Sequence, residues 1–208
     1  MIRLGEIALL RLLQLADSAL PIGGTAHSFG LETLTDEGAL TPDNVGTFLH
    51  EHLQEGGALE VSFVRRSYKR CDLLALSEEL SARKLARESR EASLKLGRRF
   101  AGLVNGMFEH SLIETELHYC IAFGAAGAAL GIAADAVVVA YLNQSIAGLV
   151  SSCQRLMPLG QAAASRILWN LKPAIVRASL NEEASCFNPY LELASMRHGS
   201  LETRLFIS

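Results

Sequence analysis

Aromatic residues and proline are scarce in this sequence. Its 208 residues include eight Phe, four Tyr, one Trp and five Pro, although half of them are hydrophobic. Alanine and leucine therefore supply much of the apolar share, a composition that favours helix over strand. No segment alternates apolar and polar residues between hairpin turns, as strands would. The composition predicts an all-α fold with a real core and excludes a disordered chain.

An excess of charge of one sign is also missing. Nineteen Lys and Arg stand against 22 Asp and Glu, which gives a formal net charge of −3. A nucleic-acid-binding domain usually carries a basic excess, so no nucleic-acid partner is expected.

Closely spaced cysteines are absent. The widely separated cysteines form no C-x-x-C motif, which argues against a disulfide framework. We therefore expect reduced thiols and a cytoplasmic protein. The four are Cys71, Cys120, Cys153 and Cys186.

Long hydrophobic runs are absent too. The strongest membrane candidate, Ile121–Ala134, holds 14 uncharged residues, ten of them Ala or Gly. A membrane-spanning helix needs about 20 residues, so a buried helix is favoured and no membrane association is expected. Glu6 and Arg11 interrupt the apolar N-terminal stretch, which argues against a signal peptide. The positive mean hydropathy of +0.23 then predicts apolar surface that the core or a partner covers.

Helical periodicity predicts a single-domain bundle of eight to ten helices. Thr41-Pro42-Asp43 is a start signal, with a capping hydroxyl, a proline at the first helical position and an acid for the helix dipole. Apolar positions from Ser81 to Met107 repeat every three, four or seven residues, which predicts one long amphipathic helix. Other helices are expected over Ile7–Leu15 (largely buried), from Ser28 to Glu37, from Thr41 through a break or bend at Gly56-Gly57 to Tyr68, after Asp72, and over Gly160–Leu171.

An Ala/Gly-rich helix pair is predicted at the centre of this bundle. Leu117–Leu130 and Asp135–Met157 are expected to be adjacent buried helices. The spacing Gly127-x-x-x-Gly131 would let two helix backbones approach closely.

Motifs of enzymes and of metal sites are absent from the sequence. There is no phosphate-binding G-x-x-x-x-G-K-[ST], no H-E-x-x-H, no G-x-S-x-G and no pair of Glu-x-x-His motifs. His50 and His52 lie two residues apart, and such positions on a helix do not face each other, so the pair is a poor chelate. We therefore expect a binding protein rather than an enzyme, without a directly bound metal or cofactor.

Three separate blocks of the sequence follow the pattern of one family. The first is Leu12–Glu32, LLQLADSALPIGGTAHSFGLE, and the third is the C-terminus, ASMRHGSLETRLFIS. The second lies between Ala122 and Leu168 and contains AFGAAGAALGI, AYL and CQRLMPLGQAAASRIL. In this order, and spanning nearly the whole chain, the blocks resemble the urease accessory proteins of the UreF type. Departures from the pattern occur at Thr25, Gly199, Glu202 and Ile207.

The resemblance implies an all-helical, dimeric, non-enzymatic chaperone. Proteins of the UreF type bind a second accessory protein, UreD (also called UreH), and the GTPase UreG. Their assembly docks on apo-urease and helps deliver nickel to its active site. The implied function is a scaffold that couples the GTPase state of UreG to nickel delivery, with the nickel handled by the complex.

Three other interpretations stay open at this point. One is a helical regulatory module unrelated to urease, and another is an enzyme whose site is assembled from dispersed residues. The last is a small membrane protein built on Ile121–Val150.

Candidate partner-binding residues lie in the matched blocks. Arg155, near the end of a buried helix, either satisfies helix C-terminal carbonyls or contacts the GTPase or the dimer mate. Pro158 and Gly160 shape the turn that follows, and Gln161 presents an amide to a partner. A second group forms either a structural turn or a partner-binding loop. Its members are Pro21, Gly23, Gly24, His27 and Glu32.

The C-terminal tail is the most informative candidate. Its apolar end, Leu205-Phe206, needs a surface that buries it. We expect residues 1–186 to form the helical domain and residues 187–208 to be loosely ordered alone and to fold onto UreD/UreH. The tail residues expected at that contact are Met196, Arg197, His198, Arg204, Leu205 and Phe206.

Overall fold

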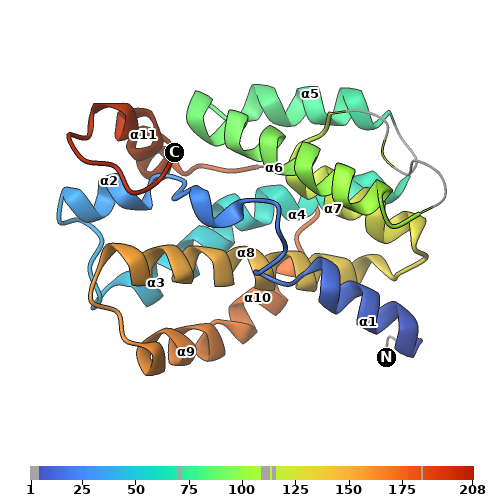
Figure 1. Ribbon diagram of the computed structural model, residues 1–208, viewed down its shortest axis with the longest axis horizontal. Coiled ribbons are helices and arrows are strands. Elements are labelled where there is room, and N and C mark those ends of the chain that lie inside the picture. Colours follow the sequence, from blue (N-terminus) through green and yellow to red (C-terminus); the bar gives the residue numbers. More distant parts are fainter. Residues whose placement is uncertain (1–4, 70–71, 109–112, 114–115, 184) are drawn as a thin grey trace.

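The computed structural model describes residues 5–69, 72–108, 113, 116–183 and 185–208. Within these ranges every regular element is helical, so the predicted all-α class is confirmed (Figure 1). Cys71 lies outside the described residues. The α-helices are α1 (Glu6–Leu15), α2 (Leu31–Asp36), α3 (Val45–His52), α4 (Ala58–Arg66), α5 (Leu73–Arg83), α6 (Arg87–Asn105), α7 (Tyr119–Ala129), α8 (Ala134–Leu156), α9 (Gln161–Asn170), α10 (Lys172–Ser179) and α11 (Pro189–Arg197).

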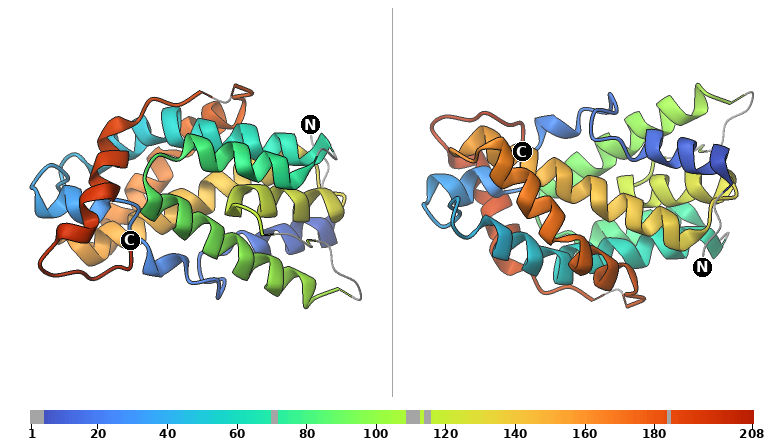
Figure 2. Two further views of the ribbon diagram at one scale, coloured as in Figure 1. Left: turned by 90° about the horizontal axis from the view of Figure 1, so that it is seen from above. Right: turned by 90° about the horizontal axis from the view of Figure 1, so that it is seen from below.

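The long helix α8 crosses the middle of the molecule, and the other helices surround it (Figures 1 and 2). On one side α7 packs against α4, α6 and α8, and on the other α9 and α10 pack along α8. α11 packs on α2, which brings the C-terminal end beside the segment between α1 and α2. Helix α1 and the C-terminal end lie on opposite sides of the molecule (Figure 1).

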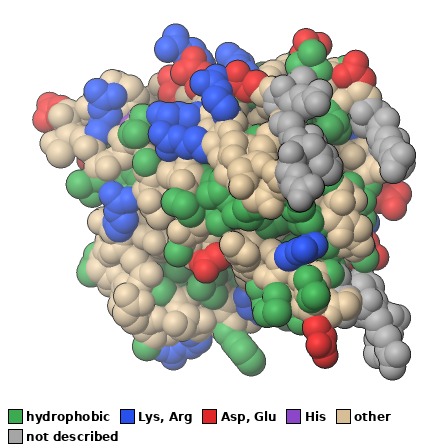
Figure 3. Space-filling model, turned by 45° about the vertical axis from the view of Figure 1, so that its right-hand side comes forward, with side chains coloured by type: hydrophobic (Ala, Val, Ile, Leu, Met, Phe, Trp, Pro, Cys, Tyr) green, Lys and Arg blue, Asp and Glu red, His purple; other side chains and the backbone are tan. Residues whose placement is uncertain are grey.

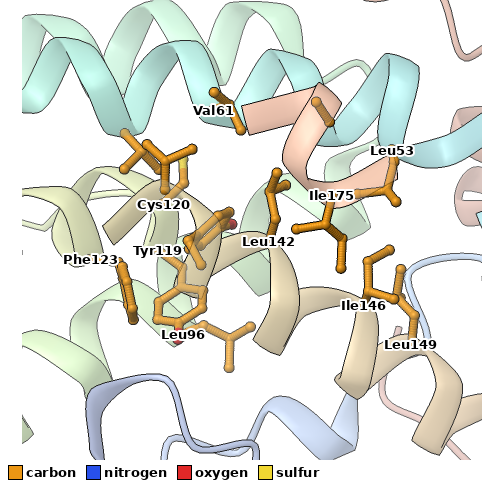
Figure 4. Close-up of a cluster of buried hydrophobic side chains, with 14 of the residues drawn as sticks. Leu53, Val61, Leu96, Tyr119, Cys120, Phe123, Leu142, Ile146, Leu149 and Ile175 are labelled. Atoms are coloured by element: carbon orange, nitrogen blue, oxygen red, sulfur yellow. The ribbon is translucent and has the colours of Figure 1, made fainter. Parts of the chain in front are cut away.

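Buried aromatic rings fill the space between α6, α7 and α8. The rings of Phe100, Tyr119, Phe123 and Tyr141 have neighbouring centroids 5.4–6.0 Å apart, in edge-on or tilted arrangements. Leu142 lies close to this group (Figure 4). Four of the thirteen aromatic residues thus lie together at the centre of the fold.

The predicted Ala/Gly-rich pair is present as α7 and α8, and every residue of α7 from Tyr119 to Gly127 is buried. A Cβ atom on Gly124 would overlap the side chain of Ser67 and come within 2.7 Å of the Val64 carbonyl oxygen. Gly127 lies against the side chains of Val137 and Tyr68, so it packs tightly, although the atoms it meets are not those of a second helix backbone as predicted. Gly131 instead adopts φ +66° in the turn after α7, where its role is to reverse the chain.

The long helix predicted from Ser81 to Met107 is wrong at its start. α5 ends at Arg83, and Lys84 and Ala86 adopt extended backbone angles before α6 begins. The break turns the side chain of Lys84 inward, where its Nζ lies 2.9 Å from Glu60 Oε1. Local periodicity cannot show this, because the partner carboxylate comes from a helix 24 residues earlier.

Other helix boundaries also depart from the prediction. α2 begins after Gly30 instead of at a Ser28 cap, and α3 begins at Val45, after Asn44. The break or bend predicted at Gly56-Gly57 is a π-helical turn, Leu53–Gly57, that keeps α3 and α4 continuous. The predicted cap is confirmed at Asp72, whose carboxylate accepts the N–H groups of Leu74 and Ala75.

Helix α1 is less buried than its apolar composition predicts. Only Leu12 and Leu15 are buried, whereas Ile7, Leu10 and Leu13 point to solvent. Figure 3 shows hydrophobic side chains gathered in a band across one face of the molecule, with Lys and Arg side chains above it. Part of the apolar excess is therefore displayed on the surface of the single chain.

One helix among the described residues, α8, passes a membrane-span test on length and composition alone. Half of its most apolar window is buried inside the fold, and core helices commonly pass the same test. The candidate predicted from the sequence, Ile121–Ala134, forms most of α7 and the turn after it.

Close helix packing gives a direct stability prediction within α6. Substitution Gly97→Ala places a Cβ atom into the Leu117 carbonyl oxygen, so we expect a loss of about 2 kcal/mol or more in the free energy of unfolding. Gly102→Ala in the same helix meets no atom within 4 Å and should be neutral or stabilising by about 0.5 kcal/mol. Urea denaturation measures both, and equal stabilities of the two variants would contradict this packing.

Candidate protein-interaction site

The side chain of Glu32, at the start of α2, is the centre of a buried polar site. It is 5% exposed and lies 2.8 Å from Nε2 of His198, which is 1% exposed. The backbone N–H groups of Leu205 and Phe206 also donate to the same carboxylate, at 2.5 and 3.2 Å. Three hydrogen-bonding groups from the C-terminal segment thus satisfy one buried carboxyl group.

The segment between α1 and α2 binds the last residues of the chain. The N–H groups of Ser28 and Phe29 both point at the main-chain oxygen of Ser208, and Ile207 N–H donates to Ala26. Phe29 has φ +53° and Gly30 has φ +92°, a left-handed pair that turns successive N–H groups to one side. A side chain on Gly30 would also meet Ser195 of α11, so glycine is required twice.

His27 completes this contact from its ring. Its Nδ1 lies 2.7 Å from the Ser208 hydroxyl oxygen. Burial, together with the positive charges of Lys95 and Arg99, lowers its pKa to about 4. The imidazole is therefore neutral at physiological pH.

Arg155 joins the end of α8 to the same site. It donates to the carbonyl oxygen of Thr25 at 2.5 Å, and its guanidinium carbon lies 4.2 Å from the centroid of the Phe206 ring. Neither contact is to a carbonyl group at the C-terminus of α8, so the prediction that Arg155 satisfies those carbonyls is wrong. Because Thr25 contributes its backbone, its departure from the family pattern does not affect this hydrogen bond.

The loop candidates are held in place from α6. Gly23 adopts φ +81°, and the guanidinium of Arg99 occupies the space that a side chain there would need. Arg99 also donates to the carbonyl oxygen of Ile22 at 3.2 Å. Pro21 is exposed beside them, and Gly24 begins a short 3₁₀ turn. The sequence contains no signal that pairs Arg99 with this loop, since the two are far apart along the chain.

The remaining predicted residues divide into exposed and buried sets. Exposed at the turn after α8 are Pro158, Gly160 and Gln161, and exposed on the tail are Met196, Arg197, Arg204 and Leu205. His198 and Phe206 are buried, so the surface contacts predicted for their side chains do not fit the structure. Their chemistry is used inside the chain, against Glu32 and Arg155.

The tail therefore has a docking place on its own chain. Residues of α11 and of the C-terminal segment contact α2 and the segment before it, and Arg197 forms an ion pair of 2.8 Å with Glu37. Ordering of residues 187–208 by a partner stays a prediction.

A second polar cluster faces a cleft of about 610 Å³ that is partly open to solvent. Glu60 accepts from Lys84 and, at 2.7 Å, from the Tyr141 hydroxyl. Burial opposes ionisation of both partners, but their opposite charges hold the pKa of Glu60 below and that of Lys84 above its usual value. Nδ1 of His52, another lining residue, has no hydrogen-bond partner, and burial lowers its pKa.

The described residues contain no assembled metal site. No group of three or more His, Cys, Asp or Glu is placed to hold an ion. Burial raises the pKa of Cys153 to about 12 and also raises that of Cys120, so these thiols are protonated at neutral pH. The contacts that build the site are hydrogen bonds and one cation–ring contact.

Comparison with known proteins now gives the family. A sequence model described as UreF matches residues 40–172. The chain belongs to the UreF family. The urease accessory protein UreF of Nostoc sp. is 34% identical over 96% of this chain and 95% of its own length. That of Paenarthrobacter aurescens is 31% identical, with 96% and 97% covered, and that of Bacillus sp. is 28% identical, with 96% and 99% covered.

The three blocks that carry the UreF resemblance meet at this one site. Glu32 and Thr25 come from the first block, Arg155 from the second, and His198 and Phe206 from the third. Hydrogen bonds and one cation–ring contact therefore link the three blocks, although they are far apart along the chain. The relatives are named accessory proteins, which suggests a role other than catalysis.

Replacing Glu32 tests whether its carboxylate holds the tail. In Glu32→Ala the His198 ring and two N–H groups lose their acceptor, and we expect a loss of about 2–4 kcal/mol in the free energy of unfolding. Amide hydrogen exchange at Leu205 and Phe206 should accelerate together. Glu37→Ala is the matched control, because its exposed ion pair with Arg197 is worth about 1 kcal/mol or less. Slow exchange at both amides in Glu32→Ala would rule out this role.

Acid should weaken the fold through His27. Its pKa is about 4 in the folded chain and 6.5 in the unfolded one, so below pH 6.5 the unfolded chain binds more protons. This residue's contribution is complete above pH 6.5 and is lost as the pH falls toward 4. Between pH 7 and 4.5 the loss for this one group is about 2 kcal/mol. Urea denaturation of wild type and His27→Asn should show a smaller pH dependence in the variant; parallel curves would contradict the assignment.

Proposed function

We propose that this protein is a non-catalytic scaffold in urease maturation. It binds the accessory protein UreD/UreH and the GTPase UreG, and it modulates GTP-dependent nickel delivery to apo-urease in the cytoplasm. Nickel is the cargo of the assembly, and this chain supplies contacts instead of metal ligands. It acts as a homodimer.

The observation that carries the proposal is the meeting of the three family blocks in one recognition site. The buried part, Glu32, His198 and Phe206, sets the position of the tail. The exposed residues of the turn after α8 and of the tail lie on the outside of the same structure, where a partner has access to them. The described site offers a neutral His27 imidazole and polar groups whose hydrogen-bond partners lie within the chain, which supports a binding role.

The tail and α11 supply the surface for UreD/UreH. Tyr190, Leu193 and Met196 recur every three residues on α11 and are each about half exposed, with Phe187 exposed before them and Leu205 after them. Such a contiguous apolar stripe on a helix suits a partner that buries it.

The turn after α8 supplies a second contact, for UreG or the dimer mate. Arg155 is held at the rim by Thr25 and Phe206, so its guanidinium is ordered before a partner binds. Pro158, Gly160 and Gln161 continue this exposed rim. Pre-ordered arginines lose little side-chain entropy on binding, which suits an interface hot spot. The rival regulatory module unrelated to urease does not account for the family membership.

The tail contact is tested by co-expression with UreD/UreH. We expect deletion of residues 187–208 to abolish co-purification and Leu193→Asp/Met196→Asp to weaken it at least about tenfold, because charges would enter an apolar contact. Leu74→Asp on α5 is the control, since Leu74 is similarly exposed away from the tail. Undiminished co-purification by the deletion variant would refute this contact.

The function itself is tested by activation of apo-urease. Nickel-dependent urease activity is measured with UreD/UreH and UreG present, with and without this protein. An activity that does not depend on the chain would sink the proposal.

A further inference from the structure

Helices α9 and α10 carry a further surface, which the contacts proposed for the tail and for the turn after α8 do not use. We call it the α9–α10 face, and it is composed of Arg166, Trp169, Lys172, Val176, Arg177 and Leu180. All six side chains are exposed. In Figure 1 α9 lies at the lower edge of the molecule and α10 rises from it toward α8, whereas α11 and the tail lie at the upper left. The view from below in Figure 2 brings α9 and α10 to the front.

The charged residues that make up this face are all cations. Residues 161–181 include two arginines and one lysine but no Asp or Glu. Lys172 donates to the amide oxygen of Asn143, and Arg177 lies 3.2 Å from His50 Nε2. Among the ion pairs of the described residues none involves Arg166, Lys172 or Arg177. The face is therefore positive on a chain whose net charge is negative.

Large apolar side chains stand among these cations. Trp169, the single tryptophan, is 77% exposed, and Leu180 and Val176 are 70% and 53% exposed. Spacings of three or four place Arg166 beside Trp169 on α9, and Lys172 beside Val176 on α10. Tryptophan and arginine are enriched in the hot spots of protein interfaces, and exposure of tryptophan to this degree leaves a large apolar area in water.

We propose that the α9–α10 face docks a partner protein whose surface presents carboxylates around an apolar centre. A second copy of the chain does not fit, because a two-fold contact through this face would set like charges against each other. Lipid does not fit either, because a membrane-surface helix separates its cations from its apolar side chains, and here they are interleaved. The inference rests on the proposed function, which supplies the assembly in which this partner is found.

This face adds a second docking point distant from the tail. A scaffold that holds one partner at the tail and another at α9–α10 brings the two to a high effective concentration without new contacts between them. The acidic partner is identified by its salt-sensitive binding, because the attraction between opposite charges at an interface becomes weaker as the ionic strength rises.

Binding measurements on the full chain test the proposal. Purified UreD/UreH, UreG and apo-urease are each titrated with wild type at low and high salt, and then with two variants. Trp169→Ala should weaken one of these associations at least about tenfold. The triple reversal Arg166→Glu/Lys172→Glu/Arg177→Glu should weaken the same association about a hundredfold and remove its salt dependence. The matched controls are Leu74→Ala on α5 and Arg87→Glu/Lys95→Glu/Arg98→Glu on α6.

The outcomes separate this inference from the proposed function. If wild type binds its partners and neither face variant changes any affinity, the α9–α10 inference is overturned and the scaffold stands. Equal losses in the α6 reversal would also overturn it, because they would show a general effect of charge. Binding to phosphatidylserine vesicles that only the face variants lose, with protein affinities unchanged, would assign the face to lipid and overturn the proposal. If wild type binds none of the three proteins, both proposals fail.

Discussion

The Glu32 carboxylate is the constraint on which the recognition site depends. A buried acid needs donors, and here they come from His198 and from two backbone N–H groups near the end of the chain. These bonds fix where the tail crosses α2, and they place Phe206 under the guanidinium of Arg155. The hydrogen-bonded side chain of Glu32 thus fixes how the first and last family blocks lie against each other. The second block joins them through the end of α8.

The rigid support for this site comes from close packing at the centre. Gly97 and Gly124 allow the backbones around α7 to approach within distances that any side chain would prevent. The aromatic rings of α6, α7 and α8 fill the space beside them. A small-residue helix at the core leaves the outer helices to carry exposed apolar side chains, such as those of α1, α11 and α10. This arrangement suits a protein that acts through its surfaces.

The buried charges show how the fold satisfies polar groups in its interior. Glu60, Lys84 and Tyr141 form a satisfied cluster in the wall of the cleft, and His27 is kept neutral by burial. Each group bonds to a partner within the chain. The contacts proposed with other proteins lie outside, at the rim beside Arg155 and on the α9–α10 face.

The sequence alone determined the helical class, the buried pair α7 and α8, the Asp72 cap and the family. Composition, periodicity, capping residues and the order of the blocks can all be read along the chain without knowing which distant residues meet. They also singled out Arg155, Glu32, His198 and Phe206 as important. Only the tertiary structure decided that these four meet, that three of them are buried, and that Lys84 breaks a helix predicted to continue. The physical reason is that each depends on a partner far along the chain, as Glu32 and His198 are, 166 residues apart. Such a pairing leaves no periodic trace in the sequence.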